Sequence, residues 1–373
     1  MIRVAINGYG RIGRVSHRVI LARFSDQIEV VAINGGSSTD IGGWANLLKY
    51  DTAYGILAGH TVQGRQGDQF FDPAQGKGDQ VPKLLGYLVV DDKQTPFYSE
   101  KNPGMLPWKK HEVDVVLECT GAFTTAEKIQ PHLTAGAKKV VLSAPAKDQT
   151  IKTYVLDVNL TDRNKTFSGE VVRPGDQIIS NASCTTNCIA PVAQIMVSKF
   201  GVNKAMMTTM HAYTSDQELQ DGGHRDYRRA RAAAMNIVPT STGSSIAAAE
   251  TVPELKGLFT GVALRVPVIV GSISDFTFHL KKEVSVEEVN QVFKEAAGSD
   301  RYKQVLEVTE EPIVSSDIVG NSHSSIVDLG LTQVVGNTPE AKMGDLVKVF
   351  AWYDNEWGYS NRLIEEVVLV GGK

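Results

Sequence analysis

The sequence predicts an α/β protein with two parts: a Rossmann-type, doubly wound domain and an α+β domain with a mostly antiparallel sheet. Three observations support this fold class. The chain has 373 residues, which at about 150 residues per domain suggests two domains. It begins in the order strand, glycine turn, helix, strand, and its second half holds strand-like runs. We place the first domain at 1–183 and the second at 184–354, and we expect a helix over 355–373 to return to the first.

The first domain alternates short runs rich in Val and Ile with segments of helical spacing, which is the pattern of a parallel sheet with crossover helices. The stretch Gly59–Leu85 is rich in Gly, Gln and Asp and is expected to be a surface loop or hairpin extension, more simply a variable insertion than a binding element. The expected strands are Ile2–Ile6, Ile28–Ile33, Val113–Glu118 and Lys139–Ser143, and the expected helices are Arg14–Arg23 and Thr125–Gly136.

The second domain reads differently, because its strand-like runs follow one another with few helices between them. One run, Ser272–Leu280, alternates apolar and polar residues, as a sheet exposed on one face does. The other expected strands are Lys204–His211, Gly261–Val270 and Lys348–Tyr353, and the expected helices are Ile189–Lys199, Val284–Ala297 and Glu356–Val370.

Composition narrows the function classes. The formal charge of −4 gives no general attraction to nucleic acid or to anionic membranes, so neither partner is expected. No apolar run approaches the ~18 residues of a membrane span, and MIRVAING lacks the apolar core of a signal peptide. The three cysteines are too few for a disulfide framework and are expected to be reduced thiols in a cytoplasmic protein. The histidines and cysteines show no metal-ligand spacing, so no metal site is expected.

The first chemical motif is G-x-G-x-x-G at Gly8, Gly10 and Gly13. In such a turn the first glycine allows the tight bend, the second lets the backbone approach the pyrophosphate, and the third lets the helix pack on the strand. The motif alone is weak evidence, but here it follows a strand and opens a helix, which is its proper context. We therefore expect a nicotinamide dinucleotide at this turn.

The end of the second strand bears on the choice between NAD and NADP. NAD sites carry an acidic residue there, about 20 residues after the motif, to bind the ribose hydroxyls. This chain has Gly35 and Gly36 instead, followed by Ser37 and Ser38. Without a carboxylate to repel the 2′-phosphate, and with room at the glycines, NADP is favoured over NAD. The alternative is that Asp40 supplies the acid.

A candidate nucleophile, Cys184, stands close before a helical stretch, where a helix N-terminus lowers a thiol's pKa. Pro191 allows a bend or a late start of that helix. His211 ends a later strand-like run and is the candidate acid and base. Cys119 and Cys188 are more simply packed thiols.

Groups suited to oxyanions follow in the second half of the chain. Guanidinium groups bind phosphate through paired hydrogen bonds, and hydroxyls beside a glycine add donors. The arginine run by itself would more simply be a solvated or interface charge run. The groups are Arg228, Arg229, Arg231, Thr242, Gly243 and Arg265.

With these residues identified, the chain resembles the phosphorylating glyceraldehyde-3-phosphate dehydrogenase family along nearly its whole length. The resemblance rests on several long motifs in the same order. These are NGYGRIGR at 7–14, ECTGAF at 118–123, SNASCTTNC at 180–188, HAYTSDQ at 211–217, HRDYRRARAA at 224–233, PTSTG at 239–243, ALRVPV at 263–268 and YDNEWGYSNR at 353–362.

The resemblance implies roles for individual residues. Cys184 would be the nucleophile and His211 its base. Thr214, Arg231 and Arg265 would hold the phosphate of the substrate, while Ser183, Thr185, Arg229, Thr242 and Gly243 would hold the attacking phosphate or line the same pocket. The cofactor would contact Gly8, Gly10, Arg11, Ile12, Gly13, Gly35, Ser37, Ser38, Lys101, Thr120, Ser143, Asn355 and Tyr359.

The family's reaction is the reversible oxidation of glyceraldehyde 3-phosphate with inorganic phosphate to 1,3-bisphosphoglycerate through a cysteine thioester, a step of glycolysis and gluconeogenesis, carried out by a homotetramer. NAD-using members carry Asp at the position of Gly35 and Leu-Pro at Gly222 and Gly223, so both positions favour NADP. Lys101 stands where the family has an arginine, and this departure argues against NADP. Lysine keeps the positive charge but cannot form the two parallel hydrogen bonds that arginine makes with a phosphate. The alternatives are an erythrose-4-phosphate dehydrogenase and a binding protein with a vestigial site.

Overall fold

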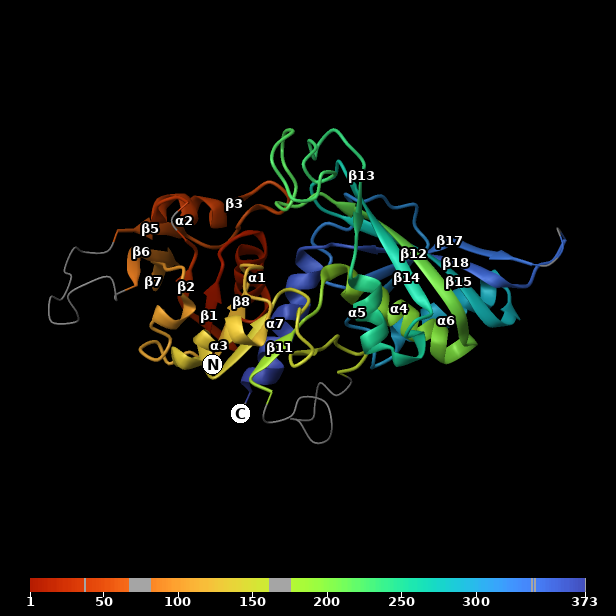
Figure 1. Cartoon of the computed structure of the whole chain (residues 1–373), viewed down its shortest axis with the longest axis horizontal. Helices are drawn as coiled ribbons and strands as arrows, with labels where there is room; N and C mark the ends of the chain where they lie inside the picture. The colour runs from red at the N-terminus through yellow and green to blue at the C-terminus, as the bar shows by residue number, and fades with distance from the viewer. Residues whose placement is uncertain (37, 67–81, 161–175, 337, 339, 373) are drawn as a thin grey trace. The chain divides into compact units, whose positions relative to one another are not determined.

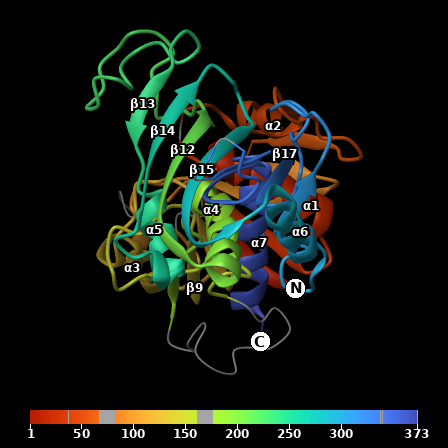
Figure 2. The ribbon, with the colours of Figure 1, turned by 90° about the vertical axis from the view of Figure 1, so that its right-hand side faces the viewer.

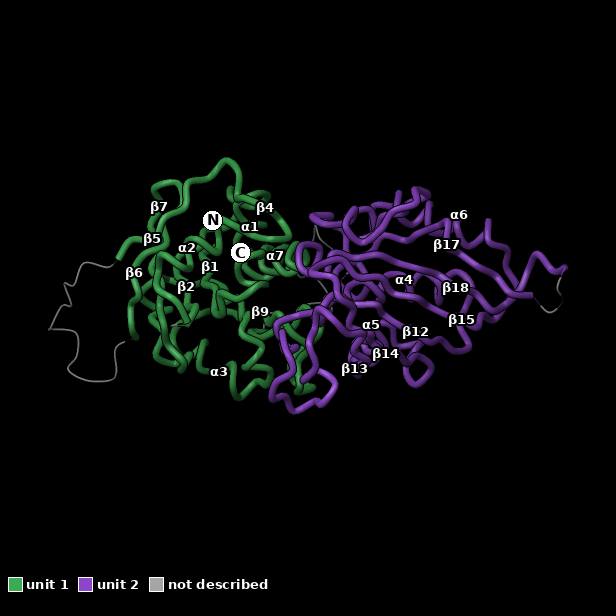
Figure 3. Tube along the Cα trace, turned by 90° about the horizontal axis from the view of Figure 1, so that it is seen from above, with its two compact units in different colours: residues 1–153, 163–181, 360–373 green, residues 154–162, 182–359 purple. Residues whose placement is uncertain are grey.

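The computed structural model describes residues 1–36, 38–66, 82–160, 176–336, 338 and 340–372. The chain divides into two compact units, shown in different colours in Figure 3: unit 1 comprises 1–153, 163–181 and 360–373, and unit 2 comprises 154–162 and 182–359. This division differs in detail from the boundary expected at 183. Ala182 and Ser183 lie with unit 2, as does 154–162, and the C-terminal helix passes from one unit to the other between Tyr359 and Ser360.

Unit 1 is built on a sheet that has nine strands in the described residues (Figure 1). Their order is β10-β11-β9-β8-β1-β2-β7-β6-β5, parallel from β10 to β7 and antiparallel from β7 to β5. The strands are β1 (Ile2–Asn7), β2 (Ile28–Asn34), β5 (Val62–Arg65), β6 (Lys83–Val90), β7 (Lys93–Ser99), β8 (Val115–Glu118), β9 (Lys139–Leu142), β10 (Lys152–Thr153) and β11 (Ile178–Ser180).

The remaining elements of unit 1 are short strands and the helices that connect the sheet. The expected extension Gly59–Leu85 includes strand β5 and the start of β6, and its residues 67–81 lie outside the described chain. The elements are α1 (Arg11–Arg23), α2 (Ile41–Lys49), β3 (Tyr50–Asp51), β4 (Gly55–Ile56), η2 (Pro103–Met105), α3 (Ala126–Thr134) and, shared with unit 2, α7 (Trp357–Gly371).

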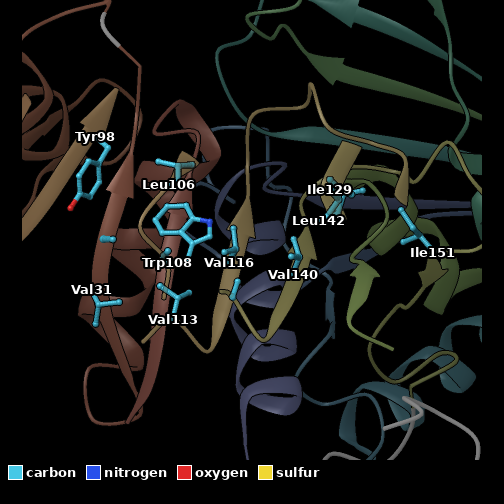
Figure 4. Close-up of a cluster of buried hydrophobic side chains, with 13 residues drawn as sticks. Val31, Tyr98, Leu106, Trp108, Val113, Val116, Ile129, Val140, Leu142 and Ile151 are labelled. Atoms are coloured by element: carbon cyan, nitrogen blue, oxygen red, sulfur yellow. The ribbon is translucent and has the colours of Figure 1, made fainter. Parts of the chain in front are cut away.

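The central residues of strands β1, β8 and β9 are apolar because a parallel sheet is covered on both faces. On one face, Trp108, Val116 and Leu142 pack together with Ile129 of α3 (Figure 4), and none of these side chains is more than marginally exposed. The C-terminal part of α7 also packs against the sheet of unit 1, since Lys139 donates a hydrogen bond to the carbonyl of Val370 at 2.6 Å.

Unit 2 is built on a second sheet, with seven strands in the part of the chain described and the order β13-β14-β12-β15-β18-β17-β16. Figure 2 shows β14, β12 and β15 side by side. The pairs β12–β14 and β16–β17 are parallel and the other four are antiparallel, as the fold class predicts. The strands are β12 (Val202–Ala212), β13 (Val238–Ser241), β14 (Phe259–Val266), β15 (Ser272–Val284), β16 (Leu306–Thr309), β17 (Ser325–Val335) and β18 (Gly344–Tyr353).

The helices α4 (Cys184–Phe200), α5 (Ser244–Thr251) and α6 (Val286–Gly298) pack on this sheet, with the short η3 (Pro253–Leu255) after α5. Helix α4 begins at Cys184 and not near Pro191, because Ser183 caps it: its hydroxyl accepts a hydrogen bond from the amide of Thr186 at 3.0 Å. Pro191 is accommodated inside the helix. Asp157 adopts a φ of 64°, in the left-handed region that glycine enters most readily.

Candidate active site

The two candidate catalytic residues meet in unit 2. Cys184 opens α4, and His211 lies near the end of β12, so a helix N-terminus and a strand end bring them together. The Sγ of Cys184 lies 3.3 Å from Nε2 of His211. On the other side of the ring, Nδ1 lies 2.6 Å from the carbonyl oxygen of Ala212. Nδ1 also lies 2.8 Å from Nη1 of Arg265, which only donates, so Nδ1 faces an acceptor and a donor at once, while Nε2 is the ring nitrogen that faces the thiol.

The electrostatics of the pair differ from the expectation of a lowered thiol pKa. Burial raises the pKa of Cys184, and this outweighs the opposite effects of Arg265 and of hydrogen bonds from Thr185. Burial also lowers the pKa of His211 to about 3, with Arg265 adding to the shift. In this conformation the pair is therefore a neutral thiol and a neutral imidazole, with the imidazole placed to take the thiol proton.

Two helix N-termini converge beside Cys184. Ser183, the cap of α4, has its hydroxyl 3.0 Å from that of Ser244, the first residue of α5. Thr242 donates to the same Ser244 hydroxyl at 2.9 Å and accepts from the Ser244 amide at 3.1 Å. Gly243 precedes α5 and caps it without a side chain. Hydroxyls and two helix N-termini together form a suitable site for an oxyanion.

The arginines expected to bind phosphate divide into two groups. Arg265 lies in the site, where its guanidinium donates to the carbonyl of Ala212 at 3.1 Å. Arg229 is near enough to contribute to the lowered pKa of His211, although it is also paired with Asp216. Arg231 lies apart: it is mostly exposed and forms an ion pair with Asp221 at 2.9 Å. The structure therefore does not bring Arg231 to the thiol.

Two buried hydroxyls near the thiol were not identified from the sequence. The hydroxyl of Tyr353 lies 3.0 Å from that of Thr185 and 2.8 Å from that of Thr209. The Tyr353 ring also packs edge-on against His211, with centroids 6.0 Å apart. Thr185 thus faces Tyr353. Tyr353 is the first residue of the YDNEWGYSNR motif, and this motif is the sequence signal from which its place near the thiol could have been inferred.

Three other expected residues also lie in unit 2. Thr214 is half-buried two residues after β12. Asn355 is buried, and its Oδ1 accepts from the Gly271 amide and the Ser272 hydroxyl, both at 3.1 Å. Tyr359 is buried and donates to the carbonyl of Ala182 at 3.1 Å. Asn355 and Tyr359 are thus held by other parts of unit 2.

The glycine turn of unit 1 has the geometry that a dinucleotide requires. Gly8 has a φ of +94°, and a Cβ there would lie 2.6 Å from the backbone of Cys119 and Thr120. A Cβ on Gly13 would lie 2.1 Å from the carbonyl oxygen of Gly8, so only glycine lets α1 approach the strand. Gly10 caps α1 without a side-chain bond, and a Cβ on it would meet nothing within 4 Å. The helix amides are thus open to an anion, and the turn fits a pyrophosphate.

The open space expected at both Gly35 and Gly36 is found only at Gly36. A Cβ on Gly35 would lie 2.3 Å from Cζ of Phe97. Phe97 is fully buried and stacks on Trp44, so its ring fills the space where an acidic side chain would begin. Asp40 is committed to capping α2, where its carboxylate accepts from the Gly43 amide at 2.8 Å.

The other expected cofactor residues of unit 1 line the same edge of the sheet or its loops. Arg11 is paired with Asp51 at 2.5 Å and is therefore not a free side chain. Ile12 is half-buried in the first turn of α1, and Ser143 follows β9. Ser38, Lys101 and Thr120 are exposed, and Ser37 lies outside the described residues.

Comparison with known proteins agrees with this geometry. Residues 2–75 and 71–126 match the model of the glyceraldehyde 3-phosphate dehydrogenase NAD-binding domain, and residues 183–355 match that of the C-terminal domain. The chain belongs to the glyceraldehyde-3-phosphate dehydrogenase family. It is accordingly an NAD(P)-dependent oxidoreductase that acts on an aldehyde group.

Full-length relatives support the same assignment. A glyceraldehyde-3-phosphate dehydrogenase of Mycobacterium avium is 48% identical over 373 residues, covering 99% of this chain and 98% of the relative. Glyceraldehyde-3-phosphate dehydrogenase 2 of Trichormus variabilis is 46% identical over 373 residues, covering 100% and 99%. The chain is therefore similar to whole proteins of this family and not to one domain alone.

Across the described ranges, no group of three or more His, Cys, Asp or Glu side chains is arranged to hold a metal ion. Among helices in the described chain, none is both long and apolar enough to span a bilayer.

Proposed function

We propose that this protein is a phosphorylating glyceraldehyde-3-phosphate dehydrogenase that favours NADP over NAD. The observation that carries the proposal is the placement of Cys184 Sγ 3.3 Å from His211 Nε2, at a helix N-terminus that meets a second one. A nucleophile, its base and an oxyanion site are thus adjacent, and acyl transfer to phosphate requires all three.

The chemistry proceeds through a thioester. With its own proton on Nδ1, towards Ala212, His211 accepts the thiol proton at Nε2 as the sulfur adds to the aldehyde carbon, and returns it to the carbonyl oxygen to give a thiohemiacetal. Nε2 is then free to accept the proton of the thiohemiacetal hydroxyl as the hydride leaves. The nicotinamide supplies the hydride acceptor when it is bound. Inorganic phosphate attacks the resulting thioester, the sulfur leaves as thiolate, and the acyl phosphate is 1,3-bisphosphoglycerate. The glycine turn of unit 1 would hold the pyrophosphate of the dinucleotide. In unit 2, the family resemblance assigns contacts with the nicotinamide to Asn355 and Tyr359.

Two oxyanion sites are assigned by the same proposal. The hydroxyls of Ser183 and Thr242 and the N-terminus of α5 at Gly243 would hold the attacking phosphate, with Arg229 nearby. Arg265 and Thr214 would hold the phosphate carried by the substrate. Binding energy from that remote phosphate orients the aldehyde carbon for attack.

NADP preference rests on Gly35 and on the small residues Gly222 and Gly223. The closeness of Phe97 to Gly35 adds support, because the chain has no space for the acidic side chain of NAD-specific sites. We further propose a homotetramer located in the cytoplasm and no nucleic-acid partner, as the family resemblance and the charge balance suggest.

The deciding experiment is the initial rate of glyceraldehyde 3-phosphate oxidation with and without inorganic phosphate, with NADP and NAD compared. A phosphate-dependent rate with the higher kcat/KM for NADP is expected. A phosphate-dependent rate that favours NAD would keep the mechanism and overturn the cofactor preference. A faster, phosphate-independent rate with erythrose 4-phosphate would identify the alternative dehydrogenase.

The Cys184→Ser variant provides the mechanistic control, with Cys188→Ala as its match one helical turn away. Cys188 is fully buried and faces Ser325, so its loss should leave turnover within a few-fold. Cys184→Ser should abolish turnover, because an alkoxide forms far less readily than a thiolate. Rapid, selective alkylation of Cys184 by iodoacetate with loss of activity is expected, whereas slow and unselective labelling would support a vestigial binding protein.

A further inference from the structure

A buried polar network lies beneath the dinucleotide turn of unit 1, and none of its central residues has a role in the chemistry above. Its centre is Glu118, the last residue of β8, which is fully buried together with His132 of α3. Within the described chain, four donors reach the carboxylate. Asn7 Nδ2 lies 2.5 Å from Oε2 and His132 Nε2 lies 3.0 Å from it, while the Thr120 amide donates to Oε1 at 2.8 Å and the Thr120 hydroxyl donates to the same oxygen.

The protonation of His132 follows from its other neighbour. The indole Nε1 of Trp108 lies 2.9 Å from Nδ1 of His132. An indole nitrogen can only donate, so Nδ1 must accept and the ring must carry its proton on Nε2. That proton points at Glu118. Trp108 therefore selects the tautomer that completes the shell of the carboxylate, and all four donors around the buried anion are uncharged.

The network joins the strand ends that form the cofactor edge. Asn7 pairs in register with Asn34 on one side and Glu118 on the other, so one row of side chains crosses β2, β1 and β8 at their carboxyl ends. Asn34 Nδ2 continues the row by donating to Asn7 Oδ1 at 2.7 Å. The sheet order reverses between β1 and β8, which is the topological switch point where open α/β sheets bind ligands.

Two loops leave this row, and both approach the crevice. The Gly8 turn follows Asn7, and Thr120 follows Glu118 after a single residue. The loops touch through their backbones, since a Cβ on Gly8 would lie 2.6 Å from the nitrogen of Thr120. The Thr120 hydroxyl in turn accepts from the amide of Ala122 at 3.1 Å, which shapes the turn at Gly121. Glu118 therefore sets the position of both loops.

We propose that Glu118 and His132 are positioning residues for the nicotinamide dinucleotide. The buried carboxylate fixes the Thr120 turn and, through Asn7, the Gly8 turn in the shape that receives the cofactor. Neither side chain contacts the cofactor itself, because both are fully buried. A buried charge costs desolvation energy, so apolar side chains of similar volume would stabilise the fold at least as well. The network is therefore better explained by its effect on the position of the two loops than by a gain in stability. The proposal holds for either dinucleotide and does not depend on the preference for NADP.

The test is the Glu118→Gln variant, which keeps size and removes one acceptor oxygen. The dissociation constants of NADP and NAD for the full-length protein are measured by fluorescence titration, and amide hydrogen exchange at Thr120 is followed without cofactor. We expect both constants to rise at least tenfold and the Thr120 amide to lose protection. At saturating cofactor kcat should stay within threefold, and the alkylation rate of Cys184 in unit 2 should not change.

Three further variants keep the outcome decisive if Glu118→Gln folds poorly. His132→Gln retains a donor for the carboxylate and should weaken cofactor binding less than His132→Leu. Trp108→Phe removes only the donor to Nδ1, so the nitrogen resonances of the His132 ring should show loss of the single Nε2–H tautomer, with a two- to fivefold weaker affinity. His111→Gln is the matched control, because its ring bonds the Tyr98 hydroxyl and not the carboxylate of Glu118, and it should bind cofactor normally.

The proposal is overturned if Glu118→Gln, or both His132 variants, bind the dinucleotides as the wild type does. It is also overturned if His132→Gln and His132→Leu lose affinity equally and in parallel with His111→Gln, since that pattern would reflect general destabilisation of unit 1.

Discussion

Introducing an acidic residue at Gly35 tests the basis of cofactor choice, and the structure shows how the test must be built. A Cβ at this position would lie 2.3 Å from Cζ and 2.6 Å from Cε1 of Phe97. That ring is fully buried and packs edge-on against Tyr9, with centroids 5.4 Å apart. Gly35→Asp alone would therefore overpack the site, at a cost of about 1–3 kcal/mol. The Phe97→Leu background removes both clashing atoms.

The charge of an aspartate at position 35 should change the preference for NADP over NAD by more than tenfold. A carboxylate and a phosphate charge about 4 Å apart repel by roughly 4 kcal/mol at an effective dielectric constant of about 20. Gly35 is half-buried, so solvent screening would reduce this to about 2 kcal/mol. Since 1.4 kcal/mol corresponds to a factor of ten, the ratio of kcat/KM for NADP to that for NAD should fall by more than tenfold.

The assay compares three proteins: Phe97→Leu, Phe97→Leu with Gly35→Asn, and Phe97→Leu with Gly35→Asp. Asn matches Asp in size without charge, so the difference between the last two isolates the electrostatic effect. Phe97→Leu alone should keep the wild-type ratio. An equal ratio in the Asn and Asp proteins would refute the reasoning and show that the 2′-phosphate binds away from this strand end.

Three other predictions follow from the geometry. Gly13→Ala should lower the thermal stability of the cofactor-free protein and weaken dinucleotide binding, whereas Gly10→Ala should weaken binding alone, because only the first substitution clashes within the protein; equal melting temperatures would contradict this. Burial lowers the pKa of His17 to about 3, below its value in the unfolded chain. The unfolded state therefore binds the extra proton first, and the free energy of unfolding falls as pH drops from about 6.5 towards 3, by up to about 1.4 kcal/mol per pH unit. Urea unfolding at pH 7 and pH 5 should show a smaller loss of this free energy in His17→Gln than in the wild type. Thr242→Val should raise the KM for inorganic phosphate with little change in the KM for glyceraldehyde 3-phosphate, and parallel changes in both would place Thr242 outside the attacking-phosphate site.

Local sequence signals predicted the positions of most elements. The glycine turn and the Val-rich runs lie where expected, because hydrophobic periodicity and turn glycines act over a few residues. The start of α4 was placed too late, since Pro191 suggested a break while the capping role of Ser183 decided the boundary. Helix α2 was not anticipated.

Charge and packing around the site depended on residues far apart in the chain. The sequence indicated a lowered pKa for Cys184 at a helix N-terminus, but burial raises it. It suggested space at Gly35, which Phe97 of another strand fills. It assigned both Arg229 and Arg231 to phosphate binding, whereas one lies near His211 and the other pairs with Asp221 on the surface.

The sequence by itself determined the family, the two-part α/β architecture and the residues able to act as nucleophile and base, because motifs and periodicity are properties of neighbouring residues. The tertiary structure alone decided which of them meet and in what electrostatic state. The tautomer of His132 is the clearest case: it depends on Trp108, Glu118 and Asn7. These side chains come from separate segments, and only the packing of the sheet brings their donors and acceptors within hydrogen-bond distance.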